Sequence, residues 1–215
     1  MVIFQALTWE TRDTEEEHLV SIFGKDEVGK SVCVTTAFTP YFFVKLPRNV
    51  TQQRVQNLYN KIDKACPGCL VSYNTINRKD VWGFQNNEQF PYLQLFFRNL
   101  ASRRMVAGRL RRPLEDEHVK MKIYESNLDP VLRLMHRTGI QSTGWIDTTD
   151  VCERAYHTKV QIDLQCNDWR QLKPHDTTDI APFVIASVDI ECYSSTGKFP
   201  SPSIPGDACF QIAIS

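Results

Sequence analysis

The stretch "VIASVDIECYSSTGKFP", residues 184–200, decides how this chain is interpreted. Val184 and Val188 are typical of a buried strand, yet Asp189 and Glu191 follow directly. Side chains alternate along a strand, so these two carboxylates are expected on one face. Two like charges held side by side cost repulsion and desolvation unless they share a proton or a cation.

Spacing alone leaves three explanations of this acid pair open. The two carboxylates share a proton, or they are simply hydrated where the strand emerges into solvent, or they bind a divalent cation. Hard ions such as Mg²⁺ or Mn²⁺ prefer oxygen ligands, and two such ions side by side are a general device for hydrolysing phosphodiesters. Asp-x-Glu is a weak motif by itself, and without further context hydration is favoured.

The composition is typical of a globular protein and excludes several function classes. Of 215 residues, 42% are hydrophobic and 23% are charged. No apolar run reaches the ~20 residues of a transmembrane helix, so no membrane partner is expected. Lys and Arg together number 25, as do Asp and Glu. Without a net charge, any contact with nucleic acid must come from a local patch.

The cysteines predict free thiols rather than disulfides. Their number, seven, is odd, and no secretory signal precedes them. The "CPGC" stretch at Cys66 and Cys69 is compatible with a redox pair, with half of a zinc site, or with a turn that ends a helix. No second CxxC accompanies it, so the turn is favoured.

Periodicity predicts an α+β chain. Strands at 1–10, 18–25 and 31–38 are expected to form one barrel-like sheet with the strands between 140 and 165. A β-α-β-β-α-β order is expected over about 40–125, which is the ferredoxin-like order of RNA-recognition modules. The polar stretch 172–182, with two prolines, is the best candidate for a linker.

Within the β-α-β-β-α-β unit, individual elements are predicted as follows. The first helix is expected to open at Thr51, and "VKMKIYE" (119–125) is expected to be the last strand. "DVWGF" is predicted as a strand whose Trp82 and Phe84 either stack on nucleic-acid bases or, as favoured, pack on the sheet. The second helix is expected to carry a stripe of Leu93, Phe96, Phe97 and Leu100.

A third, short capped helix is predicted in "NLDPVLRLMHRTG", residues 127–139. Asp129 suits the N-cap, Pro130 suits the first helical position and Gly139 can end the helix.

A cluster of arginines between Arg98 and Arg112 contains no acid. The cluster either contacts the phosphates of a nucleic acid or forms a solvated helix face that complements the helix dipole and the acids at 115–117. The solvated face is favoured, and the candidates for phosphate contact are Arg103, Arg104 and Arg109.

Two segments resemble the family B DNA polymerases. "SVDIECYSSTGKFPSP" followed by "QIAIS" resembles the first exonuclease motif of that family, in which an apolar strand ends in Asp-Ile-Glu and a loop carries Phe-Pro. "KIYESNLDPVLRLMHRTGIQSTGW", from residue 122, resembles the stretch that precedes the exonuclease domain. The delta-type enzymes and those of large DNA viruses are most similar, whereas residues 1–110 carry no diagnostic motif.

The resemblance implies a mechanism and a fold. The residue that matches Asp189 bridges two ions, Mg²⁺ or Mn²⁺, and the residue that matches Glu191 binds one of them, on the first strand of a ribonuclease H-like domain. The implied activity is 3′–5′ removal of mismatched nucleotides, beside a separate polymerase activity in DNA replication. Phe199 matches a loop residue that packs or contacts the primer strand at most.

The resemblance also implies a domain arrangement. Residues 1–172 correspond to an N-terminal domain of largely structural role, and residues 173–215 to the start of the exonuclease domain. The family's further exonuclease ligands and its polymerase aspartates lie downstream of the matched motif, so this chain alone is expected to be inactive. The apolar final stretch "ACFQIAIS" (208–215) also indicates a fragment.

The expected partners follow from the same resemblance. They are a DNA primer-template, deoxynucleoside triphosphates at the polymerase part, and a sliding clamp with accessory subunits, in a nucleus or a viral replication compartment. Two alternatives stay open: a nucleic-acid-binding module with an RNA-recognition-like fold, and a free-standing ribonuclease H-like nuclease.

Overall fold

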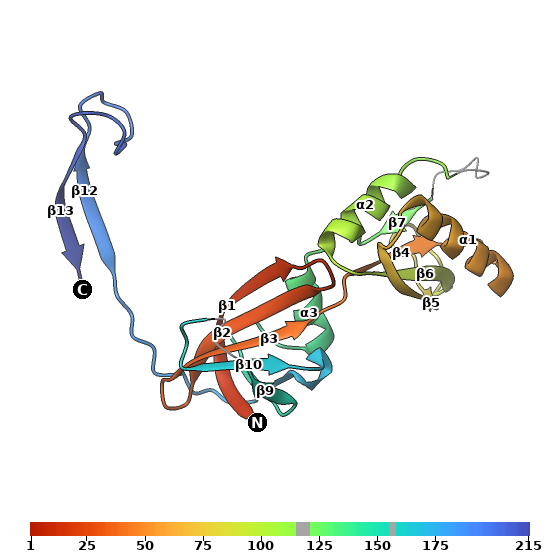
Figure 1. Cartoon of the computed structure of the whole chain (residues 1–215), viewed down its shortest axis with the longest axis horizontal. Helices are drawn as coiled ribbons and strands as arrows, with labels where there is room; N and C mark the ends of the chain where they lie inside the picture. Colours follow the sequence, from red (N-terminus) through yellow and green to blue (C-terminus); the bar gives the residue numbers. More distant parts are fainter. Residues whose placement is uncertain (115–120, 155–157) are drawn as a thin grey trace. The chain divides into compact units, whose positions relative to one another are not determined.

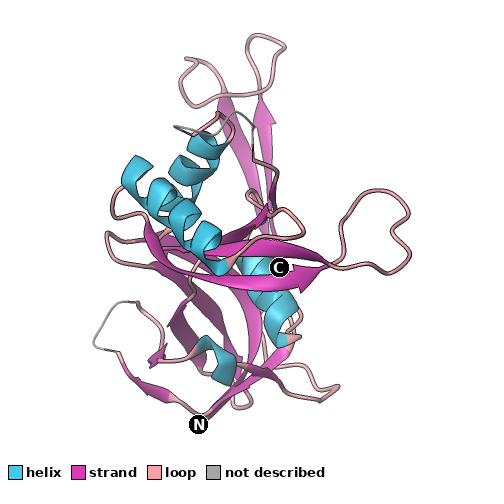
Figure 2. Cartoon of the chain, turned by 90° about the vertical axis from the view of Figure 1, so that its right-hand side faces the viewer, coloured by secondary structure: helices cyan, strands magenta, loops and turns pink. Residues whose placement is uncertain are grey.

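The computed structural model divides the chain into two units, Met1–Ala181 and Pro182–Ser215. It describes residues 1–114, 121–154 and 158–215. Strands make up most of the regular structure, as Figure 2 shows, and the architecture is α+β, as predicted. Among the described residues, no helix is long and apolar enough to cross a membrane.

The first unit contains a seven-stranded sheet in the order β11-β8-β1-β2-β3-β10-β9 (Figure 1). The strands that begin the chain and those that follow residue 140 therefore share one sheet, as the patterning predicted. β10 runs parallel to β3, and the other pairs are antiparallel. The strands are β1 (Val2–Asp13), β2 (His18–Asp26), β3 (Ser31–Ala37), β8 (Trp145–Thr148), β9 (Val151–Glu153), β10 (Ile162–Cys166) and β11 (Lys173–Pro174).

One helix packs on this sheet. α3 (Pro130–Thr138) begins and ends where the sequence predicted, because the Asp129 side chain accepts hydrogen bonds from the first-turn N–H groups and Gly139 adopts a left-handed conformation. Leu134 of α3 is buried in the sheet's core with Phe4 and Ile146. A short 3₁₀ helix, Trp169–Gln171, packs its tryptophan on the same core.

The first unit extends to Ala181, beyond the predicted boundary between residues 172 and 173. The stretch after β11 is tied to the sheet by three hydrogen bonds. Trp145 Nε1 donates to the Asp179 carbonyl at 2.7 Å, and His175 N donates to the Trp145 carbonyl at 2.9 Å. Ala181 N donates to Gln5 Oε1 at 2.7 Å. The predicted linker 172–182 is thus largely part of the first unit.

The same unit contains a four-stranded antiparallel sheet in the order β5-β6-β4-β7. Apolar residues of α1 and α2 share one core with inward residues of β4 and β6, so both helices cover the same face of this sheet. The elements are β4 (Tyr41–Lys45), α1 (Gln52–Ala65), β5 (Leu70–Arg78), β6 (Phe90–Phe97), α2 (Leu100–Leu110) and β7 (Ile123–Tyr124).

Two predicted elements of this region were wrong. Most of the apolar stripe assigned to the second helix belongs to strand β6, namely Leu93, Phe96 and Phe97, because both faces of that strand carry large apolar residues and therefore mimic a helical stripe. Within the stripe, Leu100 lies in α2. α2 begins only at Leu100, after the Asn99 side chain accepts a hydrogen bond from Ser102 N. Trp82 and Phe84 lie in the loop between β5 and β6 and not on a strand.

Other predictions of this region were confirmed. α1 opens at Thr51, whose side chain accepts a hydrogen bond from Arg54 N. "CPGC" forms the turn after α1, with Gly68 at a φ of +70°. The acids at 115–117 and the start of the predicted strand 119–125 lie outside the described residues.

The second unit is a two-stranded antiparallel hairpin, β12 (Val188–Tyr193) and β13 (Ala208–Ile214). Ser187 and Ser215 exchange backbone hydrogen bonds of 2.9 and 3.0 Å at its open end. The side chains of both strands are exposed or partly exposed, so this pair of strands buries no core of its own among the described residues.

Candidate functional site

The acid pair lies on β12, as predicted. Asp189 pairs across the hairpin with Ala213, and Glu191 pairs with Gln211. Because directly opposed residues of an antiparallel pair share a face, this face carries two carboxylates beside one small and one amide side chain. Both carboxylates are exposed.

The opposite face of the hairpin is apolar. Val188 pairs with Ile214 and Ile190 pairs with Ile212, so four branched side chains alternate with the acids. All four are more than half exposed. The sequence pattern predicted that these apolar residues are buried, whereas among the described residues they are exposed. The apolar face suits packing under a further layer.

A register shift between Glu191 and Cys192 interrupts the hairpin directly after the acid pair. Glu191 opposes Gln211 and Cys192 opposes Cys209, so Phe210 of β13 has no opposed residue. This is a β-bulge, which increases local twist and often lies beside functional groups. The acid pair therefore sits on the regular part of the ladder.

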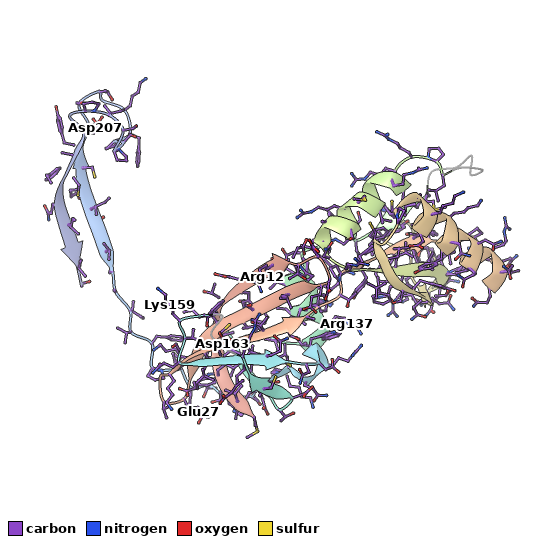
Figure 3. All side chains as sticks on the ribbon, in the orientation of Figure 1. Arg12, Glu27, Arg137, Lys159, Asp163 and Asp207 are labelled. Carbon is purple, nitrogen blue, oxygen red and sulfur yellow. The ribbon has the colours of Figure 1, made fainter. Side chains whose placement is uncertain are left out.

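The loop between the two strands is organised by Asp207, which is labelled in Figure 3. Its carboxylate accepts hydrogen bonds from Ser201 N, Ser195 N and the Ser195 hydroxyl at 2.8–2.9 Å. These bonds, led by the one from Ser201 N, hold the pKa of Asp207 below its ordinary value. Phe199 is carried on this loop and is almost fully exposed.

The donor set of the acid face fits a hard divalent cation in type. Carboxylate oxygens are the ligands that Mg²⁺ and Mn²⁺ prefer, and both acids lie on one face of one strand. Among the described residues, no group of three His, Cys, Asp or Glu side chains gathers at one place. Asp189 and Glu191 are therefore the ligands that this hairpin can offer.

The structure separates the three arginines that were candidates for phosphate contact. Arg103 is 5% exposed and donates to the Leu128 carbonyl at 2.7 Å, so its guanidinium holds the fold together and is not available to a phosphate. Burial, followed by the nearby Arg133, lowers the pKa of Arg103. Arg104 is exposed on α2, and Arg109 is half-buried and donates to the Pro113 carbonyl at 2.9 Å.

Arg133 is a buried arginine that the sequence did not predict, and it covers aromatic rings on the helix-free face of the four-stranded sheet. Arg133 of α3 is 3% exposed, and its guanidinium lies 3.9 Å from the Tyr41 ring centroid. It donates to the Tyr41 carbonyl at 2.9 Å and to Glu125 Oε2 at 2.8 Å. Glu125 itself has a φ of +60°, a costly backbone conformation for a residue with a side chain. No pattern in the sequence predicts this left-handed conformation of Glu125.

The CPGC turn with its two cysteines comes directly after the last residue of α1. Both are free and buried after α1. Burial, followed by the neighbouring Cys69, raises the pKa of the Cys66 thiol. The interpretation of this stretch as a turn is thereby supported.

Comparison with known proteins places these features in a family context. Residues 121–215 match a family model described as the exonuclease domain of DNA polymerase family B. The match begins inside the first unit, includes α3, and runs through the whole hairpin with its acid pair.

Curated relatives match almost the whole chain. The DNA polymerase of Paramecium bursaria Chlorella virus NY2A is 32% identical over 220 residues, covering 96% of this chain and 22% of that protein. The DNA polymerase delta catalytic subunit of Schizosaccharomyces pombe is 30% identical over 210 residues, covering 90% of this chain and 19% of that protein. The chain thus spans about a fifth of the length of these relatives.

A solved structure shares the fold. The family B DNA polymerase of the hyperthermophilic archaeon Pyrobaculum calidifontis matches with a TM-score of 0.72 at 17% identity, covering 99% of this chain and 25% of that chain. At this identity the likeness concerns the fold alone.

Proposed function

The chain belongs to the family B DNA polymerases, and from that premise we propose that it supplies two metal ligands to the 3′–5′ proofreading site of a DNA-directed DNA polymerase. The observation that carries this proposal is the hairpin of the second unit, which presents Asp189 and Glu191 on one face, inside the segment that matches the family's exonuclease domain. The polymerase activity belongs to the longer protein that the relatives represent.

Each acid of the pair has a defined task in this proposal. Asp189 and Glu191 would hold Mg²⁺ or Mn²⁺, two ions in the intact site, and such ions would supply an activated water and stabilise the leaving oxygen of a phosphodiester. The strand fixes the two carboxylates on one face, and Ala213 opposite Asp189 leaves room above them. The apolar face of the hairpin anchors the pair against the rest of a ribonuclease H-like domain.

Contacts with the DNA itself are assigned to residues that are exposed or half-buried. Of the predicted set, Arg104 and Arg109 are proposed to meet backbone phosphates, and Phe199 is proposed to contact the primer strand from its loop. Arg104 is exposed, and no carboxylate among the described residues pairs with it. Arg103 is left out because it is buried.

We further propose that the four-stranded unit is ferredoxin-like. Its chain order β4-α1-β5-β6-α2-β7 and its sheet order β5-β6-β4-β7 support this classification. A role as an RNA-recognition module of the usual kind has less support, because Arg133 covers the aromatic rings of the helix-free face.

The intact protein is expected to act on a primer-template with deoxynucleoside triphosphates, and with a sliding clamp and accessory subunits. Its expected place is a nucleus or a viral replication compartment. These partners follow from family membership and are tested only with the full-length enzyme.

The decisive experiment uses that full-length enzyme. Asp189→Ala and Glu191→Ala are each expected to reduce removal of a mismatched 3′ nucleotide by at least about 100-fold, with nucleotide incorporation retained. Glu153→Ala is the matched control, because it removes an exposed carboxylate of β9, outside the hairpin. Unchanged proofreading in both acid variants would end the proposal.

A further inference from the structure

The loop between β5 and β6 exposes three large apolar side chains within four residues. Val81 is 74% exposed, Trp82 is 80% exposed and Phe84 is 94% exposed. Gly83 stands between the two aromatics with a φ of +80°, and a Cβ there would meet no atom within 4 Å. An aromatic pair left in water in this way gains free energy once its faces are covered.

The stem of this loop is held in place, although its tip is exposed. Asp80 Oδ1 accepts hydrogen bonds from Val81 N at 2.7 Å and from the Tyr124 hydroxyl at 3.2 Å, while its other oxygen pairs with Lys45. The Lys45 hydrogen bond holds the pKa of Asp80 below its ordinary value. The aromatic tip is therefore presented from a stem that strands β4 and β7 fix.

Gln85 closes the tip from the other side. Its Oε1 accepts a hydrogen bond from Asp80 N at 2.9 Å, and its Nε2 donates to the Trp82 carbonyl. Gln85 thus bridges the turn that carries both aromatic residues, and its hydrogen bonds fix the backbone of that turn.

Charge around the loop favours an anionic partner. Lys45 and Arg48 at the stem are balanced by Asp80 and Glu88, with which they form ion pairs. The preceding pair, "RK" at 78–79, has no carboxylate partner among the described residues; Lys79 donates to Asn87 Oδ1 and Arg78 is exposed. Two unneutralised cations thus stand next to two unburied aromatic rings.

Single-stranded nucleic acid offers partners for both features of this loop, the exposed aromatic rings and the cations without a carboxylate partner. Bases of a single strand offer flat faces that stack on aromatic side chains, and its phosphates offer negative charge. Duplex bases are already stacked on each other, so they cover no additional ring. The helix-free sheet face cannot serve instead, because Tyr92 is 3% exposed and Arg133 covers Tyr41.

We propose that segment 78–85, the end of β5 and the loop after it, is a binding site for single-stranded DNA, in which Trp82 and Phe84 stack on bases while Arg78 and Lys79 contact phosphates. The choice of DNA over RNA rests on the function proposed above. The stacking itself rests on this loop alone.

The test titrates the 215-residue chain with a short dye-labelled oligothymidylate. Trp emission reports stacking on Trp82, and anisotropy of the dye measures affinity in every variant, including those without Trp82. Trp82 is the most exposed of the four tryptophans, so stacking quenches its emission. Trp82→Phe is expected to abolish the quench while affinity stays within about twofold, because an aromatic face remains. The double variant Trp82→Ala/Phe84→Ala is expected to weaken binding by at least about 5-fold and up to about 150-fold.

Controls separate stacking from general apolar docking. Val81→Ala removes an exposed apolar side chain of the same loop but no ring, and is expected to leave the affinity within about twofold. A duplex of equal length is expected to give no quench. Three results would overturn the proposal. The first is a loss of affinity in Val81→Ala equal to that of the double variant, and the second is a Trp emission that does not change on titration. The third is a Trp emission that changes with protein concentration alone, because that would indicate self-association.

Two further outcomes keep this inference distinct from the proposed function. A stronger quench by an oligouridylate would overturn the assignment to DNA. Oligonucleotide binding by the loop does not depend on Asp189. Intact proofreading together with no quench of Trp emission would therefore refute the binding site in the loop and leave the nuclease assignment standing. The reverse result, a quench without Asp189-dependent proofreading, refutes the nuclease assignment alone.

Discussion

His18 Nδ1 lies 2.7 Å from Asp13 Oδ1 across the turn between β1 and β2. The same carboxylate accepts hydrogen bonds from Leu100 N and Ala101 N, each at 3.1 Å, at the start of α2. His18 is buried. One aspartate therefore joins the end of β1, in the seven-stranded sheet, to the first turn of a helix that packs on the other sheet.

Replacing this aspartate is expected to weaken the first unit. Asp13→Ala removes an acceptor from the helix start and leaves His18 Nδ1 buried without its partner, a loss of about 2–3 kcal/mol. Urea unfolding followed by tryptophan fluorescence measures it, since all four tryptophans lie in this unit. Glu15→Ala, an exposed acid in the same turn, is the control and should change the free energy of unfolding little.

The same variant should show a particular pH dependence. Burial opposes ionisation of Asp13, but the hydrogen bonds from His18, Leu100 and Ala101 outweigh it, so its pKa is lowered in the folded protein. A lowered folded pKa contributes stability that is complete above the unfolded value and is lost as the pH falls through the folded value. The difference between wild type and Asp13→Ala should be constant above about pH 5 and shrink below about pH 4. A difference that grows in acid would contradict this assignment.

The buried arginine of α3 offers a second prediction. Arg133→Met keeps the volume but leaves the Tyr41 and Glu125 carbonyls without their donor and removes the cation from the Tyr41 ring. We expect a loss of about 2–4 kcal/mol in the free energy of unfolding. Arg137→Met, on the exposed side of the same helix and labelled in Figure 3, should cost less than about 0.5 kcal/mol. Equal effects would show that Arg133 has no special role.

Two glycines should respond oppositely to alanine. A Cβ at Gly24 would lie 1.9 Å from the Gln5 carbonyl oxygen, so Gly24→Ala must push β1 and β2 apart. A Cβ at Gly108, within α2, meets nothing within 4 Å. Thermal unfolding should show a lower midpoint for Gly24→Ala and about 0.5–1 kcal/mol of added stability for Gly108→Ala.

The arginines of α2 can be separated by the salt dependence of DNA binding. Removing one contact between a cationic side chain and a phosphate lowers the slope of log affinity against log salt by about 0.9 for duplex DNA. Arg104→Gln in the full-length enzyme should lower the slope by about that amount, whereas Arg12→Gln, on β1 and labelled in Figure 3, should not. An unchanged slope in the Arg104 variant would show that Arg104 contacts no phosphate and belongs to a solvated helix face.

The 215-residue chain by itself is expected to have no nuclease activity. Two carboxylates on one hairpin do not hold two ions at a catalytic geometry, and the hairpin buries no core that would fix them. Incubation of the purified chain with a labelled single strand and Mg²⁺ measures this. Cleavage that disappears in Asp189→Ala would show that the hairpin suffices.

The sequence predicted those parts of the fold that local chemistry determines. α3 has an Asp N-cap, a proline at the first helical position and a glycine at its end, and it was placed to the residue. The acid face of β12 was also predictable, because strand alternation fixes which side chains share a face. Both predictions needed only neighbours in the chain.

The errors arose where a contact distant in sequence decides the outcome. β6 is apolar on both faces because one faces α1 and α2 and the other faces Arg133 and its aromatic neighbours, so its pattern resembled a helix. Arg103 could not be recognised as buried, since its partner is the Leu128 carbonyl, 25 residues away. The exposed position of Trp82 was missed for a different reason, because the β propensity of its neighbours suggested a strand.

The pairing of Asp189 with Ala213 also has a steric consequence. An alanine projects only one carbon from the backbone, so it leaves the space beside the carboxylate open to whatever enters between the two strands' side chains. A bulkier residue at position 213 would project into that space and crowd the carboxylate. In the proposed metal site, the small side chain at position 213 is therefore needed as well as the charge of Asp189 opposite it.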